Sequence, residues 1–182
     1  MKALKLELCI GAVLLLAALA GCSSTATKSP DVAGGIHKAL DQAGFKDVST
    51  SQDRDKGVVT LGGHVASDAE KAQAQAIAEP LAGGQVVANE IAVIPPNDQH
   101  DAKAANSDLD KVIEQNLEAA LIQDRLRKGV KYSVKNHVVT LTGEVDSQDT
   151  RAQAQQVAAS VPNVQQVVNE LQVKNQKATA SN

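Results

Sequence analysis

The chain of 182 residues carries a formal net charge of −3 and two aromatic residues, one Phe and one Tyr. Proteins that bind nucleic acids need a basic face, and those that bind single strands also need aromatic platforms on which bases stack. The composition therefore excludes a nucleic-acid-binding protein. The length allows one ordinary domain or two small ones.

The first residues predict an export signal. Lys2 and Lys5 form a positively charged start, and residues 8–20 form an apolar run without a charge. This run of about 13 residues is shorter than the roughly 20 that a membrane-spanning helix needs. It ends in Leu-Ala-Gly-Cys at residues 19–22, which resembles the lipobox of bacterial lipoproteins.

Cys22 is the residue on which the prediction of a lipid anchor depends. By the resemblance to a lipobox, residues 1–21 are a signal peptide, and Cys22 becomes the first mature residue and carries fatty acids such as palmitate. Each buried methylene contributes about 0.8 kcal/mol, so two or more acyl chains hold a protein stably on a bilayer. Ser23 follows, where an Asp would favour the inner membrane, so the resemblance implies the periplasmic face of the outer membrane. The alternative is an ordinary cleaved signal with a chance cysteine.

The rest of the chain contains an internal repeat. Residues 58–93 and 138–173 align without a gap at a shift of about 80 residues, and about 17 of the 36 aligned positions are identical. Repetition at this level indicates two copies of one small domain, which we place at residues 31–94 and 108–174.

The first half of the first copy predicts a helix followed by two strands. Val32, Ile36 and Leu40 are spaced as on one face of a helix, and Gly44 is suited to end that helix in a left-handed conformation. The strands are indicated by Val48, by a turn at residues 55–57, and by the alternating Val59, Leu61 and Val65.

A second helix and a last strand complete the first copy. Ser67 and Glu70 form a capping box, in which each side chain accepts a hydrogen bond from a free backbone N–H. The helix is expected over residues 68–81, with small residues that allow close approach to a sheet. The last strand is expected to carry Val87, Ile91 and Val93.

The second copy predicts the same order of elements. Its first helix carries a broader apolar stripe of Leu109, Val112, Ile113, Leu117, Ala120 and Leu121, with Gly129 just past its end. Ser147 caps a second helix expected over residues 148–161. The strands are indicated by Val134, by Val139, Leu141 and Val145, and by Val167, Leu171 and Val173.

The predicted fold class is α+β, with two tandem domains of the order α-β-β-α-β. In each, the helices pack on a small three-stranded sheet, and a unit of this size is marginally stable alone. Polar segments flank and separate the domains: a tether at residues 22–30, a fairly stiff linker at 95–107 that starts with two prolines, and a tail at 175–182 that is typical of disorder.

Each copy resembles a BON domain, a module found in osmotically induced periplasmic proteins, secretins and channels. The motif V-V-T-L-x-G-x-V at residues 58–65 and 138–145 carries this resemblance, together with V-x-N-E-[IL]-x-V at 87–93 and 167–173. A lipobox followed by two such domains resembles the dual-BON outer-membrane lipoproteins that help to maintain envelope integrity. The resemblance implies no catalytic residues and no cofactor. It also implies that the first helix of the second domain contacts anionic phospholipid.

The residues around that helix give an independent reason to expect a membrane surface. On a helical wheel, Ile122 and Leu126 fall away from the main apolar stripe, beside Arg125. Residues 125–135 hold five basic residues and no acid, whereas residues 31–94 hold about 5 positive and 9 negative side chains. Apolar residues beside basic ones suit shallow insertion among anionic headgroups. The predicted phospholipid-binding residues are Ile122, Arg125, Leu126, Arg127, Lys128, Lys131 and Tyr132, of which Tyr132 is the candidate aromatic anchor.

Other interpretations remain open for these residues. Ile122 and Leu126 could pack on a strand or on the other domain, with the basic residues forming a solvated face. The chain could instead be a protein-interaction or chaperone-like module of the osmotic stress response with an envelope protein as partner and no lipid contact, or an assembly component of a ring or secretion channel. Binding to headgroups weakens as salt rises, whereas an apolar protein contact does not, so salt dependence distinguishes the first two functions.

The remaining candidate sites are weak. The four histidines show no spacing typical of metal ligands, so we expect no metal site. The sequence contains no nucleophile elbow and no glycine loop that cradles phosphate, and we expect no enzyme activity. Asn89-Glu90 recurs as Asn169-Glu170, and because each Asn shares strand parity with the apolar residues, a structural hydrogen bond is favoured over a binding site.

Overall fold

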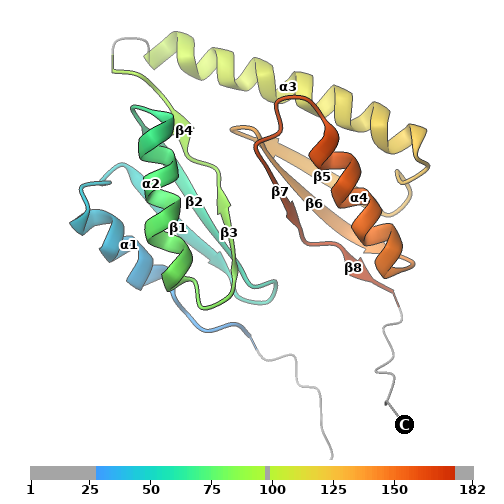
Figure 1. Ribbon diagram of the computed structural model, residues 1–182, viewed down its shortest axis with the longest axis horizontal. Helices are drawn as coiled ribbons and strands as arrows, with labels where there is room; N and C mark the ends of the chain where they lie inside the picture. Colours follow the sequence, from blue (N-terminus) through green and yellow to red (C-terminus); the bar gives the residue numbers. More distant parts are fainter. Residues whose placement is uncertain (1–27, 97–98, 175–182) are drawn as a thin grey trace, which may run out of the picture.

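The computed structural model describes residues 28–96 and 99–174, so the lipidation site predicted at Cys22 lies outside the described residues. Two α+β domains lie side by side, and the long helix α3 runs along one end of both (Figure 1). The first domain contains α1 (Ala33–Gln42), β1 (Val48–Asp53), β2 (Val58–Val65), α2 (Asp68–Ala78), the short 3₁₀ helix η1 (Glu79–Leu81), β3 (Val86–Asn89) and β4 (Ala92–Val93). The second contains α3 (Gln99–Gln123), β5 (Val130–Lys135), β6 (Val138–Val145), α4 (Gln148–Ser160), β7 (Gln166–Asn169) and β8 (Gln172–Val173).

The sheet of each domain has the same topology. In the first domain, β2 is central, with β1 antiparallel on one side and β3 and then β4 parallel on the other. In the second domain, β6 takes the place of β2, with β5, β7 and β8 around it. The predicted α+β class and the α-β-β-α-β order are confirmed. The last strand of each copy, expected to be continuous, consists of two short pieces.

A repeated asparagine explains the break in the last strand. The side-chain oxygen of Asn89 accepts a hydrogen bond from the backbone N–H of Ile91 at 3.4 Å, which turns the chain away from the regular ladder. Its amide group donates to the carbonyl of Lys71 and to Gln75, both at 3.0 Å, and so fastens the strand to α2. Asn169 makes the equivalent bonds to Leu171, Arg151 and Gln155. The structural role expected for both asparagines is confirmed.

Both helices of each domain cover one face of its sheet. Ile36 and Leu40 of α1 pack with Ala74 and Ala78 of α2 on the apolar residues of β2. The second core is built in the same way from α3, α4 and β6, and contains Ile113, Leu117, Leu121, Val139, Leu141, Ala154 and Ala158. The helix caps are local and match their predictions: the Ser67 hydroxyl accepts from the Glu70 N–H at 3.3 Å, and Ser147 accepts from the Thr150 N–H at 3.1 Å.

The segment expected to be a linker differs from its prediction. Residues 99–107 are helical and form the first part of α3, so the first helix of the second domain begins well before its apolar stripe. Asn106 donates to the carbonyl of Val93 at 3.4 Å and joins this part of α3 to the first domain. The connection between the domains is therefore partly a helix that contacts both of them.

The domains pack through the edges formed by β3 and β7. The apolar part of this contact is small and consists of Val58, Ala88, Val138 and Val168. The side chain of Gln166 accepts from the N–H of Asn89 at 2.9 Å and donates to the carbonyl of Val87 at 2.7 Å. One glutamine side chain thus takes the place of a neighbouring strand at the edge of β3.

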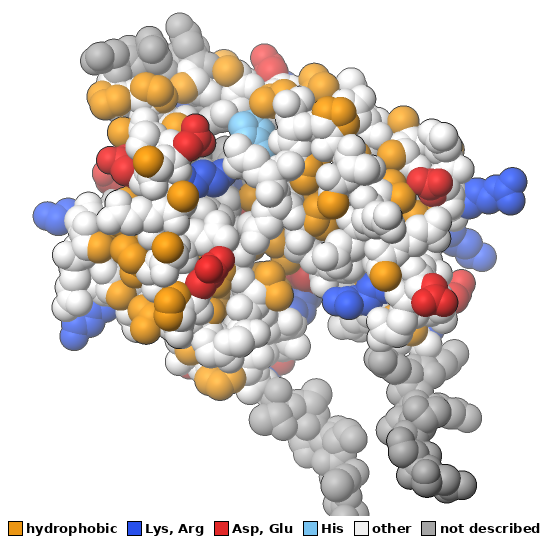
Figure 2. All heavy atoms as spheres, in the orientation of Figure 1, with side chains coloured by type: hydrophobic (Ala, Val, Ile, Leu, Met, Phe, Trp, Pro, Cys, Tyr) orange, Lys and Arg blue, Asp and Glu red, His pale blue; other side chains and the backbone are white. Residues whose placement is uncertain are grey.

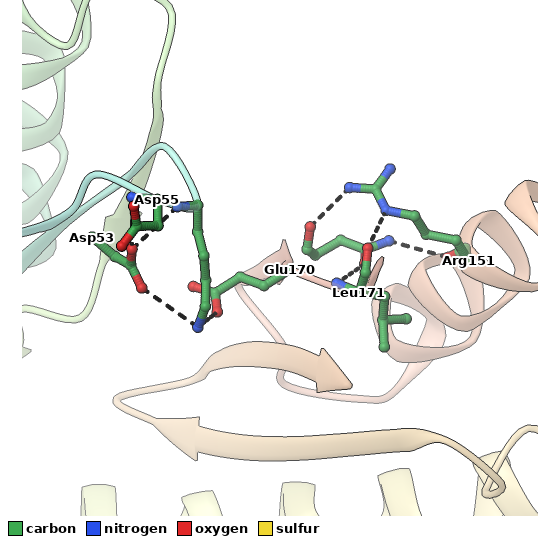
Figure 3. A network of polar contacts seen from close by, with 7 residues as sticks. Asp53, Asp55, Arg151, Glu170 and Leu171 are labelled. Atoms are coloured by element: carbon green, nitrogen blue, oxygen red, sulfur yellow. Dashed lines mark hydrogen bonds and ion pairs between the residues drawn. The ribbon is translucent and has the colours of Figure 1, made fainter. Parts of the chain in front are cut away.

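Among the described residues, two ion pairs cross the domain boundary, and both use the glutamate of the repeated Asn-Glu motif. Glu170 contacts the Lys56 amine at 2.6 Å (Figure 3), and Glu90 contacts the Lys135 amine at 3.0 Å. The Glu170 side chain is 9% exposed, and its hydrogen bond raises the pKa of Lys56. The glutamate after each repeated asparagine therefore joins the two domains, which explains why the pair recurs.

Candidate functional site

The predicted site lies where α3 ends and β5 begins. The helix ends at Gln123, before the Gly129 at which the sequence placed its end. The N–H of Arg125 bonds to the carbonyl of Ile122 at 3.0 Å, and that of Leu126 bonds to Leu121 at 2.8 Å. These two bonds form a Schellman motif, in which the residue at the Arg125 position adopts a left-handed conformation. Arg125 has φ 59°, although glycine is the residue that favours this conformation.

Leu126 is the member of the predicted site that the structure contradicts. Its side chain is 5% exposed and belongs to the core of the second domain. The Schellman motif brings the residue after the left-handed position back against the helix, so Leu126 packs on Leu121. Leu126 is therefore a core residue, as the alternative interpretation had it, and does not contribute to a surface. In the first domain Phe45 follows Gly44 in the same way.

Four of the predicted residues form an exposed group, which we call the basic surface: Ile122, Arg125, Lys128 and Lys131. Ile122 is 57% exposed, the most exposed large apolar side chain of the described residues. Arg125, Lys128 and Lys131 are exposed, and within residues 28–96 and 99–174 they form no ion pair. Figure 2 shows Lys and Arg side chains projecting from the edge of the molecule where α3 ends.

Arg127 and Tyr132 belong instead to a cluster around Glu118. The Glu118 carboxylate accepts from the Tyr132 hydroxyl at 2.6 Å and from Nε of Arg127 at 2.9 Å. These bonds lower the pKa of Glu118, with the Tyr132 hydroxyl as the larger cause. The guanidinium of Arg127 also lies 5.7 Å from the centre of the Tyr132 ring. The charge of Arg127 and the hydroxyl of Tyr132 are thus engaged within the protein.

A role for Glu118 was not predicted from the sequence, because only the charged residues of the segment 125–135 were considered. Glu118 lies four residues before Ile122, on the same face of α3, whereas Arg125 lies beyond the end of the helix. A helical wheel that included α3 upstream of Ile122 would have found an acid inside the basic region. Lys135, counted among the five basic residues, is the one that pairs with Glu90 across the domain boundary.

Tyr132 is expected to titrate with a pKa of about 12, because burial and its bond to Glu118 favour the neutral phenol. Since the unfolded pKa is about 10, this contribution to stability is present below about pH 10 and is lost as pH rises toward 12. Ultraviolet absorbance of tyrosinate measures the titration without interference, because the chain has one tyrosine. In Glu118→Gln the pKa of Tyr132 should fall part of the way toward 10. An unchanged value would contradict the role of Glu118.

No group of three or more His, Cys, Asp or Glu side chains among the described residues is arranged to hold a metal ion. No helix within the described ranges has the length and apolar content needed to cross a bilayer.

The chain is similar to several known proteins. Osmotically-inducible protein Y of Escherichia coli (strain K12) is 29% identical over 137 residues, which cover 74% of this chain and 67% of that protein. Two structures of CdsD, a structural protein of the type III secretion system of Chlamydia trachomatis, match at 15% identity. The structure of its C-terminal domain has a TM-score of 0.32 and covers 81% of this chain and 99% of its own, and the other has a TM-score of 0.35 and covers 76% and 90%.

The model of the BON domain matches twice, at residues 32–95 and 109–175. These ranges contain both copies of the repeat and most of the elements described above. The chain belongs to the BON domain family, with two BON domains in tandem.

Proposed function

We propose that this protein is a lipid-anchored envelope-maintenance protein whose second BON domain binds anionic phospholipid. The basic surface is the observation that carries the proposal, because three exposed cations without an acidic partner among the described residues follow an exposed isoleucine within nine residues of the chain. The similarity to an osmotically-inducible protein supports a role in the osmotic stress response, in the periplasm. The mechanism is binding, without turnover of a substrate.

The expected free energies of interaction indicate a weak contact between the basic surface and the membrane. A lysine or arginine near an anionic bilayer contributes about 1 kcal/mol, and the contribution falls off within about one Debye length, about 8 Å at physiological salt. Arg125, Lys128 and Lys131 together therefore contribute about 3 kcal/mol, and shallow burial of Ile122 adds an apolar term. Arg125 also adopts a left-handed conformation that costs about 1 kcal/mol relative to glycine.

The anchor at Cys22 would strengthen this contact. Among the described residues, Ser29 is the first whose backbone is bonded to the first domain, through the carbonyl of Arg54 at 2.9 Å. Six residues lie between Cys22 and Ser29, and the seven Cα–Cα steps that join them span at most about 25 Å when extended. An anchor this close would keep the basic surface at a high effective concentration of lipid, so a weak second contact would suffice.

Co-sedimentation with vesicles tests the proposal in the absence of the anchor. Residues 23–182 without acyl chains are mixed with anionic or zwitterionic vesicles at low and at high salt. We expect binding to the anionic vesicles alone, and loss of that binding at high salt, because headgroup attraction is screened. No binding to either vesicle would contradict the phospholipid proposal and would favour the alternative, a protein-interaction module that uses Ile122 and Val112, which is 46% exposed on the same helix.

A further inference from the structure

A cavity of about 290 Å³ lies where the two domains and the first part of α3 meet. Lys71 of α2, Asn106 of α3, and Asn136 and Gln165 of the second domain supply its polar wall. Ile91 and Val93 supply an apolar wall on the side of the first domain. The cavity exists because the domains are docked, and it includes none of the four residues of the basic surface.

The Lys71 amine is a buried charge without a carboxylate partner among the described residues. The residue is 8% exposed, and its amine donates to the carbonyl of Asn136 at 3.3 Å and to the side-chain oxygen of Gln165 at 3.0 Å. An ammonium group has three N–H donors, so one remains. Burial lowers the pKa of Lys71. A buried ammonium is costly unless a negative charge compensates it.

The equivalent residue of the second domain shows that the fold itself does not require this arrangement. Arg151 lies 80 residues after Lys71, at the matching position of α4. Its guanidinium donates to the carbonyls of Asn169 and Leu171, both at 2.9 Å and both within its own domain (Figure 3). Lys71 reaches instead across the domain boundary into the wall of the cavity.

Asp68 and Asp110 are the acidic residues whose charges favour the ammonium form of Lys71, but neither forms an ion pair with it among the described residues. Both carboxylate oxygens of Asp110 accept backbone N–H groups, from Asn136 at 2.8 Å and from His137 at 2.9 Å. Asp68 lies in the first turn of α2 and lines the cavity, but its side chain is exposed and forms no ion pair with the Lys71 amine within the described residues.

We propose that the cavity binds a small oxyanion, a carboxylate or a phosphate, as the counter-ion of Lys71. The oxyanion accepts the third N–H of the Lys71 amine and the amide N–H of Gln165, whose oxygen already accepts from Lys71. A short carbon portion of the ligand lies against Ile91 and Val93. Because the wall comes from both domains, the bound ligand holds them together and stabilises the docked arrangement.

The midpoint temperature of thermal unfolding, measured on residues 23–182 with and without added anion, tests this site. The probes are inorganic phosphate, acetate and glycerol 3-phosphate, each compared with sodium chloride at the same ionic strength. A ligand at ten times its Kd should raise the midpoint by about 3 °C. A larger effect of glycerol 3-phosphate than of phosphate would identify a lipid headgroup as the source, and the reverse would identify free phosphate. No rise beyond that in sodium chloride with any probe would overturn the proposal.

Lys71→Met is the informative variant, because it keeps the length of the side chain and removes the charge. It should abolish the rise, whereas Lys38→Met, at an exposed position of α1, should leave the rise unchanged. An equal rise in Lys71→Met would also overturn the proposal. If that variant does not fold, NMR titration of the unaltered chain decides: phosphate should shift the amide signals of Lys71 and Gln165, and unshifted signals would contradict the site.

Discussion

Replacement of Gly63 by alanine is expected to destabilise the first domain by about 3 kcal/mol, whereas the same change at Gly62 should cost less than about 1 kcal/mol. Gly63 has φ +90°, and a Cβ there would lie 2.0 Å from the backbone carbonyl oxygen of Asp47. At Gly62 a Cβ meets the side chain of Ser49 at 3.0 Å, which can rotate away. Thr142 occupies the matching position of the second repeat, so that site tolerates a side chain.

Urea unfolding of the two variants measures the difference. A domain of about 65 residues has little stability to spare, so the Gly63→Ala chain should show a first domain that is unfolded or nearly so. Gly143→Ala repeats the test in the second domain, because its Cβ would lie 2.2 Å from the carbonyl oxygen of Gly129. Equal stability of the Gly62 and Gly63 variants would show that the backbone relaxes without cost and would contradict the prediction.

The features that the sequence predicted well are those set by neighbouring residues. Ser67 caps α2 because its hydroxyl reaches an N–H three residues on, and that geometry depends on local sequence alone. The alternating residues of β2 and β6 predict strands because one face of each is buried against helices. The repeat strengthened both predictions, since the same pattern occurs twice.

Leu126 shows where such reasoning fails. A helical wheel assumes that the helix continues, and on that assumption Leu126 lies off the apolar stripe. The helix instead ends at Gln123 through a left-handed residue, and this residue is Arg125, where the usual signal would be a glycine. Gly129, which offered that signal, serves β5: it has φ +85°, and a Cβ there would collide with the carbonyl of Glu144.

The contacts between the domains lay beyond the reach of sequence patterns. Lys56 and Glu170 are 114 residues apart, and no local periodicity links a hairpin turn to the end of a distant strand. The repeated Asn-Glu pair was recognised, but its two residues act differently: the asparagine bonds within its own domain, and the glutamate bonds to the other. A motif repeated in a tandem protein can therefore encode how the copies dock.

Charge reversal of the basic surface is expected to weaken binding to anionic vesicles by more than about 100-fold. The variant changes Arg125, Lys128 and Lys131 to Glu and leaves Arg127 in place, because Arg127 is paired with Glu118. Loss of three cations at about 1 kcal/mol each corresponds to about 150-fold, and the new acids add repulsion. Co-sedimentation with anionic vesicles at low salt measures the change.

A second triple variant distinguishes binding through the basic surface from binding that depends only on the net charge of the chain. Lys38, Lys46 and Lys103 are exposed and lie on α1, the loop after it, and the first part of α3. Their change to Glu alters the net charge by the same amount, yet binding should fall by less than about threefold, because distant charges are screened at a Debye length of about 8 Å. Equal losses in both variants would mean that binding follows net charge alone. Since the unaltered chain is itself negative, at −3, attraction to an anionic bilayer requires a cationic region turned toward it.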